Sequence, residues 1–155
     1  MGENLVKTLI IYKSVHHGNT LKIAKVMADV LEAELMDLKD ASVNFIEEYD
    51  LIGFGSGIYK ARPHKELIKF IDDLNKVKSK KAFVFTTSGI GYSRYNSFLK
   101  NKLSEKYFEI VGEFSCKGFD TWGPFKYIGG ISKGKPDKDD LKNAENFAND
   151  LKKKF

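Results

Sequence analysis

The chain has 155 residues, of which 42% are hydrophobic and 13% aromatic, a composition typical of a folded protein. This length predicts a single domain over residues 1–155 that buries roughly two thirds of its unfolded surface. The sequence lacks an apolar run of the ~20 residues that cross a bilayer, and it lacks the apolar stretch of a signal peptide. Cys116 is the single cysteine, which excludes an intrachain disulfide and a cysteine-based metal site. We therefore expect a cytoplasmic protein that does not bind membranes.

The formal net charge is +5, and the sequence pI is about 9.1. A basic balance can indicate nucleic acid, a membrane surface or an acidic protein as the partner. Lysines cluster at residues 78–81 and 152–154, but neither cluster lies within the aromatic pattern that single-stranded nucleic acid requires. We expect no nucleic-acid partner, while an acidic protein partner stays open.

The first half of the chain alternates strand and helix patterns. Residues 8–12 are continuously apolar, as in a strand buried on both faces of a parallel sheet. Apolar residues at helical spacing predict a helix over residues 19–32. Residues 34–38 predict an edge strand, residues 42–48 a connection with a helical turn, and residues 50–55 a third strand that runs into a loop.

The second half continues this alternation. The pattern predicts two more strands, at residues 81–86 and 108–116, and three more helices, beginning near Pro63, Ser93 and Asp137. Five strands that alternate with four helices predict a doubly wound α/β domain. In such domains ligands bind at the carboxyl ends of the strands, next to the point where the strand order reverses.

The loop between the first strand and the first helix, KSVHHGNT at residues 13–20, has the composition of an anion site. The first amides of a helix have no intrahelical partner and carry the positive end of its dipole, so they can hold a phosphate. Ser14, Asn19 and Thr20 would add neutral donors, and Gly18 would let the backbone approach closely. The sequence therefore predicts a phosphate-binding loop.

Tyr12-Lys13-Ser14 followed by Gly18-Asn19-Thr20 resembles the phosphate loop of flavodoxins and of the wider flavodoxin-like flavoprotein family. The resemblance extends from residue 8 to about residue 151. It implies a flavodoxin-like doubly wound three-layer sandwich with a five-stranded parallel sheet in the order 2-1-3-4-5. It also implies flavin mononucleotide (FMN) as the cofactor, with the phosphate on this loop. The chain departs from the family at Val15 and His17, where flavodoxins usually have hydroxyl residues.

The resemblance implies that two later loops hold the flavin ring. Family members place an aromatic residue after the third strand, where this chain has Gly57, Ile58 and Tyr59, so Tyr59 is expected to stack on the ring. The loop after the fourth strand would reach the flavin edge through its backbone amides, and its aromatic residue would cover the second face. Its candidate residues are Thr87, Ser88, Gly89, Gly91 and Tyr92.

The remaining candidates are less specific. His16 and His17 are candidate donors near the phosphate, and no Cys/His/Asp cluster at ligand spacing surrounds them, so no metal site is predicted. His64 is expected at a helix start, and Cys116 is expected to be a small buried residue. The aromatic residues at 119–127 pack over the sheet edge, cap the flavin or dock a partner.

The leading hypothesis is an FMN-binding protein that transfers electrons between redox partner proteins. No catalytic triad or acid–base pair is evident, so no catalytic residue is predicted. One alternative is an FMN-dependent reductase or oxidase that acts on a quinone or porphyrinogen; another is a binding module with weakened FMN affinity, as Val15 and His17 suggest. Electron-carrying flavodoxins are typically acidic, so the positive charge departs from the resemblance and puts the usual partners in doubt; a basic carrier would prefer an acidic partner. Monomer and homodimer both stay open.

Overall fold

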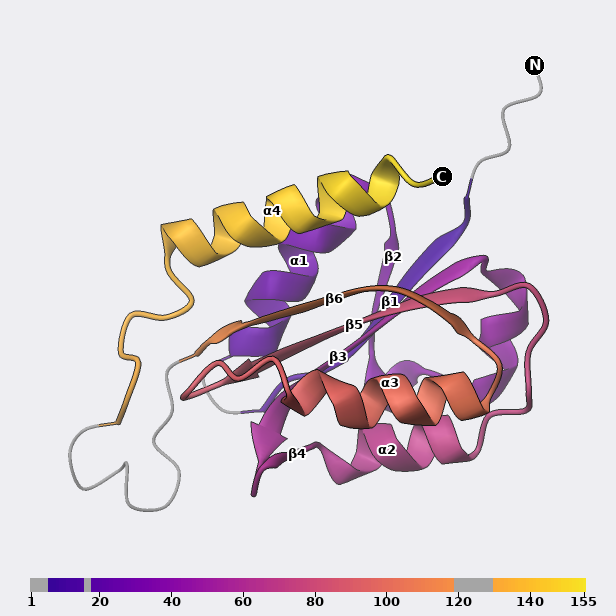
Figure 1. Cartoon of the computed structure of the whole chain (residues 1–155), viewed down its shortest axis with the longest axis horizontal. Coiled ribbons are helices and arrows are strands. Elements are labelled where there is room, and N and C mark those ends of the chain that lie inside the picture. The colour runs from indigo at the N-terminus through magenta and orange to yellow at the C-terminus, as the bar shows by residue number, and fades with distance from the viewer. Residues whose placement is uncertain (1–5, 16–17, 119–129) are drawn as a thin grey trace.

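The computed structural model describes residues 6–15, 18–118 and 130–155. Within these residues, five parallel strands form the sheet in the order β2-β1-β3-β5-β6, which confirms the predicted order because these are the first to fifth long strands (Figure 1). A two-residue strand pairs antiparallel with the end of β3. The strands are β1 (Thr8–Lys13), β2 (Glu34–Asp37), β3 (Leu51–Tyr59), β4 (Arg62–Pro63), β5 (Lys81–Ser88) and β6 (Glu109–Lys117).

Helices cover both faces of this sheet and complete the predicted three-layer sandwich. In Figure 1, the first and last helices lie on one face and the second and third helices on the other. Two short 3-10 helices, η1 (Leu38–Asp40) and η2 (Val43–Glu48), connect β2 to β3. The α-helices of the described residues are α1 (Asn19–Leu31), α2 (Lys65–Asp72), α3 (Tyr95–Glu105) and α4 (Lys138–Lys152).

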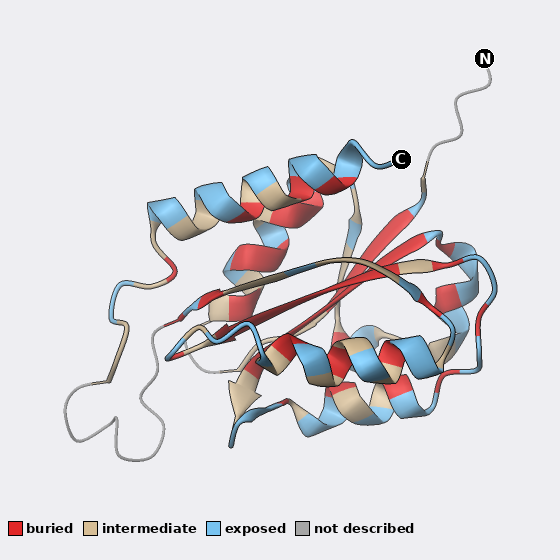
Figure 2. Cartoon of the chain, in the orientation of Figure 1, coloured by how far each residue is buried: buried red, intermediate tan, exposed pale blue. Residues whose placement is uncertain are grey.

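The sheet separates two hydrophobic cores, since successive side chains of a strand point to opposite faces. Phe54, Leu67 and Leu99 belong to the core under α2 and α3, whereas Ile10 and Met27 belong to the core under α1 and α4. The central strands are buried along nearly their whole length, and the helices expose only their outer faces (Figure 2). This double coverage is the reason that their sequences read as continuous apolar runs.

Two glycines of β3 make room for aromatic rings of β5. A Cβ on Gly53 would lie 2.3 Å from the ring of Phe83, and one on Gly55 would lie 2.1 Å from the ring of Phe85. Both rings are fully buried and stacked, with their centroids 6.1 Å apart. The glycines in this strand are therefore required by side-chain packing.

The end of β3 differs from the sequence prediction, because the strand runs on to Tyr59 instead of ending at residue 55. The extension is stabilised on one edge by β5 and on the other by β4, where Ile58 faces Pro63. Lys60 and Ala61, with φ of 52° and 64°, form the two-residue turn between β3 and β4. Such turns usually contain Asn or Gly, so no local sequence pattern indicated this hairpin.

The predicted helix starts also needed correction. Pro63 lies in β4 and not in the first turn of a helix. Instead α2 begins at Lys65, and His64 caps it: its Nδ1 accepts a hydrogen bond of 3.1 Å from the backbone N–H of Glu66. This cap confirms the prediction that His64 lies at a helix start. The third helix begins at Tyr95, two residues after the predicted start.

Candidate functional site

The three predicted loops meet at one edge of the sheet, because β1, β3 and β5 are neighbours. At their carboxyl ends Lys13 pairs with Ser56, and Gly57 pairs with Thr87. The sequence placed each loop after a strand but could not show that they meet; the parallel register brings them together.

The first loop leads directly into α1. Gly18 is the residue before the helix, with φ of 65° and ψ of 26°, and apart from its chain neighbours no atom of the described residues lies within 4 Å of the position that a Cβ would take. The first turn of α1 contains no acidic residue. The hydroxyl oxygen of Ser14 accepts a hydrogen bond of 3.2 Å from the N–H of Leu21, and a hydroxyl that accepts in this way can still donate its own proton. The loop thus offers donors and open space to an anion.

Thr20 and Thr87, both predicted site residues, contact each other beneath this loop. Their hydroxyl oxygens are 2.8 Å apart and hydrogen-bonded, and the two residues are only 2% and 4% exposed. The bond holds the first turn of α1 on the end of β5. Both residues therefore help to position the first and third loops of the site. Their direct contact with a phosphate or flavin stays a prediction.

Asn19 connects the first loop to the end of β6. A Cβ on Gly118 would lie 2.5 Å from the side-chain nitrogen of Asn19, so the amide group packs against the backbone of Gly118. The N–H of Gly118 in turn donates a hydrogen bond of 2.9 Å to the carbonyl of Ser88. The first and third loops are held to the same segment, a connection that sequence spacing did not reveal.

Tyr59 lies at the end of β3 and is half-buried. Its ring is edge-on to His64, with the centroids 5.1 Å apart and the planes at 82°. Its hydroxyl would be 2.8 Å from a Cβ on Gly57, so the phenol folds back over that glycine. Gly57 and Tyr59 thus form one packing unit, flanked by the half-buried Ile58.

Two hydrogen bonds hold the loop after β5, one within the loop and one from Ser132. The hydroxyl oxygen of Ser88 accepts a bond of 2.7 Å from the N–H of Gly91, which has φ of 76°. The carbonyl of Gly89 accepts a bond of 2.7 Å from the hydroxyl of Ser132. Tyr92 is 44% exposed, and the guanidinium of Arg94 lies 4.6 Å from its ring centroid. An aromatic ring therefore stands at the surface of this loop.

His16, His17 and residues 119–127, for which the sequence suggested contact with a phosphate, flavin or partner, lie outside the described residues. Among the described residues, no group of three or more His, Cys, Asp or Glu side chains is arranged to hold a metal ion. Likewise, no helix in the described part of the chain has the length and apolarity to span a membrane.

Two titratable groups near the site have shifted pKa values. Burial, followed by the charge of Lys13, lowers the pKa of His64, in keeping with an imidazole nitrogen that accepts a hydrogen bond. Burial raises the pKa of Cys116 to about 12, so its thiol stays protonated near neutral pH. Cys116 is thus the small buried residue that the sequence predicts and not a nucleophile.

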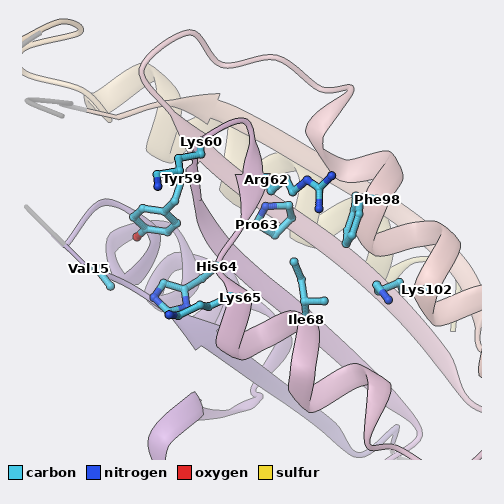
Figure 3. A pocket seen from close by; sticks show the side chains of 10 residues that line it. All are labelled: Val15, Tyr59, Lys60, Arg62, Pro63, His64, Lys65, Ile68, Phe98 and Lys102. Carbon is cyan, nitrogen blue, oxygen red and sulfur yellow. The ribbon is translucent and has the colours of Figure 1, made fainter. Parts of the chain in front are cut away.

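Sequence reasoning missed a pocket of about 730 Å³ beside these loops (Figure 3). It lies between β4, α2 and α3, and Val15 of the first loop and Tyr59 also line it. Arg62, Phe98 and Lys102, which line it, come from two elements far apart in the sequence. No local pattern could indicate their proximity.

A family model described as a flavodoxin domain matches residues 9–116, which include all three loops. This chain belongs to the flavodoxin domain family. An uncharacterized protein of Methanocaldococcus jannaschii is 49% identical over 150 residues, covering 96% of this chain and 99% of that protein. The family assignment thus rests on sequence as well as on fold.

Solved structures show the same fold at lower identity. Flavodoxin 2 from Bacillus cereus superimposes with a TM-score of 0.74 at 22% identity, covering 96% of this chain and 99% of that one. A Fusobacterium nucleatum flavodoxin mutant bound to flavin mononucleotide superimposes with a TM-score of 0.69 at 16% identity, covering 97% and 98%. These matches confirm the predicted flavodoxin-like sandwich.

Proposed function

We propose that this chain acts as a single domain that binds one FMN non-covalently and transfers electrons between redox partner proteins. The observation that carries this proposal is the start of α1. There Gly18 faces open space, Ser14 has a proton to donate, and no acidic side chain in the first turn opposes a phosphate. An anion at such a position is favoured by the helix dipole and by the first backbone amides.

The other two loops complete the proposed site. Tyr59 would contact one face of the flavin ring and Tyr92 the other, while Thr87, Ser88 and Gly89 would line its edge. When bound, the flavin supplies the redox chemistry, and the protein supplies binding, orientation and electrostatics. The FMN named for the Fusobacterium nucleatum relative supports this choice of flavin.

The side chains near the proposed site favour a carrier over an enzyme. His64 is engaged in capping α2, and the thiol of Cys116 is buried and protonated. The carboxylate of Glu66 is paired with Lys13 at 3.0 Å. None of these groups is placed to donate or abstract a proton at a substrate, so we assign the chain a role in electron transfer.

Titration of flavin-free protein with FMN and with riboflavin tests the proposal. We expect one FMN per chain, with quenching of its fluorescence, and weaker binding of riboflavin because it lacks the phosphate. Absence of FMN binding would instead support a flavodoxin-fold module that does not use the cofactor. Rapid oxidation of NAD(P)H by the loaded protein alone, without a partner reductase, would support the reductase alternative.

A further inference from the structure

The pocket between β4, α2 and α3 has the dimensions of a small-molecule site. Its volume of about 730 Å³ falls within the range of roughly 300–1,000 Å³ that is usual for such sites. Pro63 is buried, and Ile68 and Phe98 are half-buried, so they give the pocket an apolar wall (Figure 3). Val15, which stands where flavodoxins usually have a hydroxyl residue, adds a further apolar side chain.

The charged residues that line this pocket are all basic. They are Lys60, Arg62, Lys65 and Lys102, and the described lining includes no Asp or Glu. The nearby carboxylates of α2 are already engaged: Asp72 pairs with Lys102 at 2.7 Å and Glu66 with Lys13 at 3.0 Å. Within the described part of the chain, Lys60, Arg62 and Lys65 form no ion pair. Lys60, Arg62 and Lys65 therefore give the pocket positive charge that is not paired with any acidic side chain of the described residues.

Two of these cations gather at one aromatic ring. The guanidinium of Arg62 lies 5.6 Å from the ring centroid of Phe98, and the ammonium of Lys102 lies 5.5 Å from it. Figure 3 shows Arg62 directed toward Phe98. Each cation is attracted to the ring. Lys102 is already paired with Asp72, whereas Arg62 is in no ion pair within the described residues, so an anion bound beside Arg62 would meet a charge that is still available to it. A planar guanidinium is also well suited to bind a carboxylate or phosphate through paired hydrogen bonds.

We propose that this pocket is a second ligand site, which binds a small organic anion with an apolar or aromatic body. The body packs on Pro63, Ile68 and Phe98, and the anionic group contacts Arg62 with Lys60 or Lys65. A concave pocket with an apolar wall and a few fixed charges favours a small molecule over a protein surface. The pocket shares Val15 and Tyr59 with the loops of the proposed flavin site, so binding measured with and without FMN shows whether the two sites are independent.

The probe is 2-naphthoate, which combines an aromatic body with one carboxylate. We follow its binding to the full-length protein by two-dimensional amide NMR, with and without FMN. The controls are neutral 2-naphthalenemethanol, which keeps the ring, and acetate, which keeps the charge. We expect 2-naphthoate to shift the amides of Arg62, Ile68 and Phe98 with and without FMN, and to bind at least about tenfold more tightly than either control, as expected for one lost charged contact.

Variants locate the binding contacts. Arg62→Gln and Phe98→Leu should each weaken 2-naphthoate by about tenfold. Lys142→Gln is the matched control, because Lys142 is an exposed, ion-paired lysine on α4, on the opposite face of the sheet, and it should leave binding unchanged. The amide spectra of the free variants show whether each is folded. If a variant does not fold, the comparison of the three probes on the wild-type protein still tests the proposal.

Several results would overturn the proposal. Equal affinity for 2-naphthoate and 2-naphthalenemethanol would mean that the basic residues have no role, and equal affinity for acetate would mean that the apolar wall has none. Displacement of 2-naphthoate by FMN, with shifts at residues 14–20, would place the probe in the flavin site. Tighter binding of hexaglutamate than of 2-naphthoate at the same amides would identify the pocket as a protein-docking surface instead.

Discussion

Gly18 combines the two properties that the proposed phosphate site requires. Its φ of 65° is unfavourable for residues with a Cβ and worst for β-branched ones. The space beside it contains no other described protein atom within 4 Å, so an added side chain would meet a bound phosphate and not the fold. Gly18→Val should therefore abolish FMN binding while the domain stays folded, with a stability loss of about 1–3 kcal/mol from backbone strain. FMN stoichiometry and urea unfolding measure the two effects.

Gly134→Val is the matched control for this prediction. Gly134 also has a positive φ, 82°, and open space at its Cβ position, but it lies outside the three loops. We expect a similar loss of stability with full FMN stoichiometry. If Gly18→Val still binds one FMN, the phosphate does not bind at this loop.

In the proposed site Tyr59 contacts the flavin ring and not the phosphate. Tyr59→Ala should weaken FMN and riboflavin by similar factors, about tenfold each, because an aromatic contact acts on both ligands. Dissociation constants from fluorescence titration check this prediction. Tyr107→Ala, which removes a tyrosine that is 62% exposed and lies outside the site, should change neither value; an unchanged affinity in Tyr59→Ala would leave Tyr59 as a packing residue.

Cys116 should make stability depend on alkaline pH. Its pKa in the folded protein is raised to about 12 by burial, whereas an unfolded cysteine titrates near about 8.5. The unfolded chain therefore loses this proton first, and the contribution to stability that is present below about pH 8.5 is lost as the pH rises toward 12. Urea unfolding of the wild type and of Cys116→Ala at pH 7.5 and 10 measures the difference.

The same burial predicts chemical inertness of this thiol. Iodoacetamide at pH 8 should leave Cys116 unmodified in the folded protein and alkylate it in urea, as mass spectrometry would show. Rapid alkylation of the folded protein would contradict both the raised pKa of Cys116 and the burial of its thiol.

At the scale of elements, Asn96 attaches α3 to the sheet. Its side chain is fully buried; its Oδ1 accepts a hydrogen bond of 2.9 Å from the hydroxyl of Thr86 in β5, and its Nδ2 donates one of 3.2 Å to the carbonyl of Phe114 in β6. A buried polar group without a partner costs about 1–3 kcal/mol. This helix also contributes Phe98 and Lys102 to the basic pocket, so the anchor fixes one wall of that pocket.

Asn96→Leu should therefore lower the free energy of unfolding by about 2–4 kcal/mol, since it leaves the Thr86 hydroxyl and the Phe114 carbonyl without Asn96 as their partner and adds an ill-fitting side chain. Ser97→Ala, at the exposed neighbouring position, should change stability by less than about 0.5 kcal/mol. Urea unfolding compares the two. A loss of less than 1 kcal/mol in Asn96→Leu would show that the anchor is not needed.

At the scale of the whole molecule, the net charge of +5 should influence how electron donors approach. A positive field attracts anions and repels cations, and salt screens both effects. We expect reduction of the FMN-loaded protein by the dithionite radical anion to slow as sodium chloride rises from 20 to 500 mM. Reduction by the methyl viologen radical cation should accelerate over the same range.

Stopped-flow absorbance at the flavin band measures both rate constants. Opposite salt dependences would support an acidic redox partner, whose association would follow the same rule. If both reductants respond to salt in the same direction or not at all, the charge of the chain has no part in the choice of partner.

The order of the strands and helices along the chain, and the pattern of the first loop, could be predicted from the sequence. Continuous apolar runs such as residues 8–12 arise because both sheet faces are covered. This pattern is local, so it can be recognised in the sequence alone. The pattern behind the proposed phosphate loop was also visible, since its residues 13–20 are contiguous between a strand and a helix; phosphate binding there stays a prediction. Strand order came from the family resemblance, which the structure confirmed.

Only the tertiary structure decided which distant residues meet. Thr20 bonds to Thr87, 67 positions away, and Phe83 fills the space above Gly53; no spacing rule encodes such pairs. The hairpin from β3 to β4 was missed because Lys60 and Ala61 are unusual residues for its turn. The basic pocket, built from β4, α2 and α3, exists only after the sheet has aligned these elements, because long-range packing and not local propensity brings its charges together.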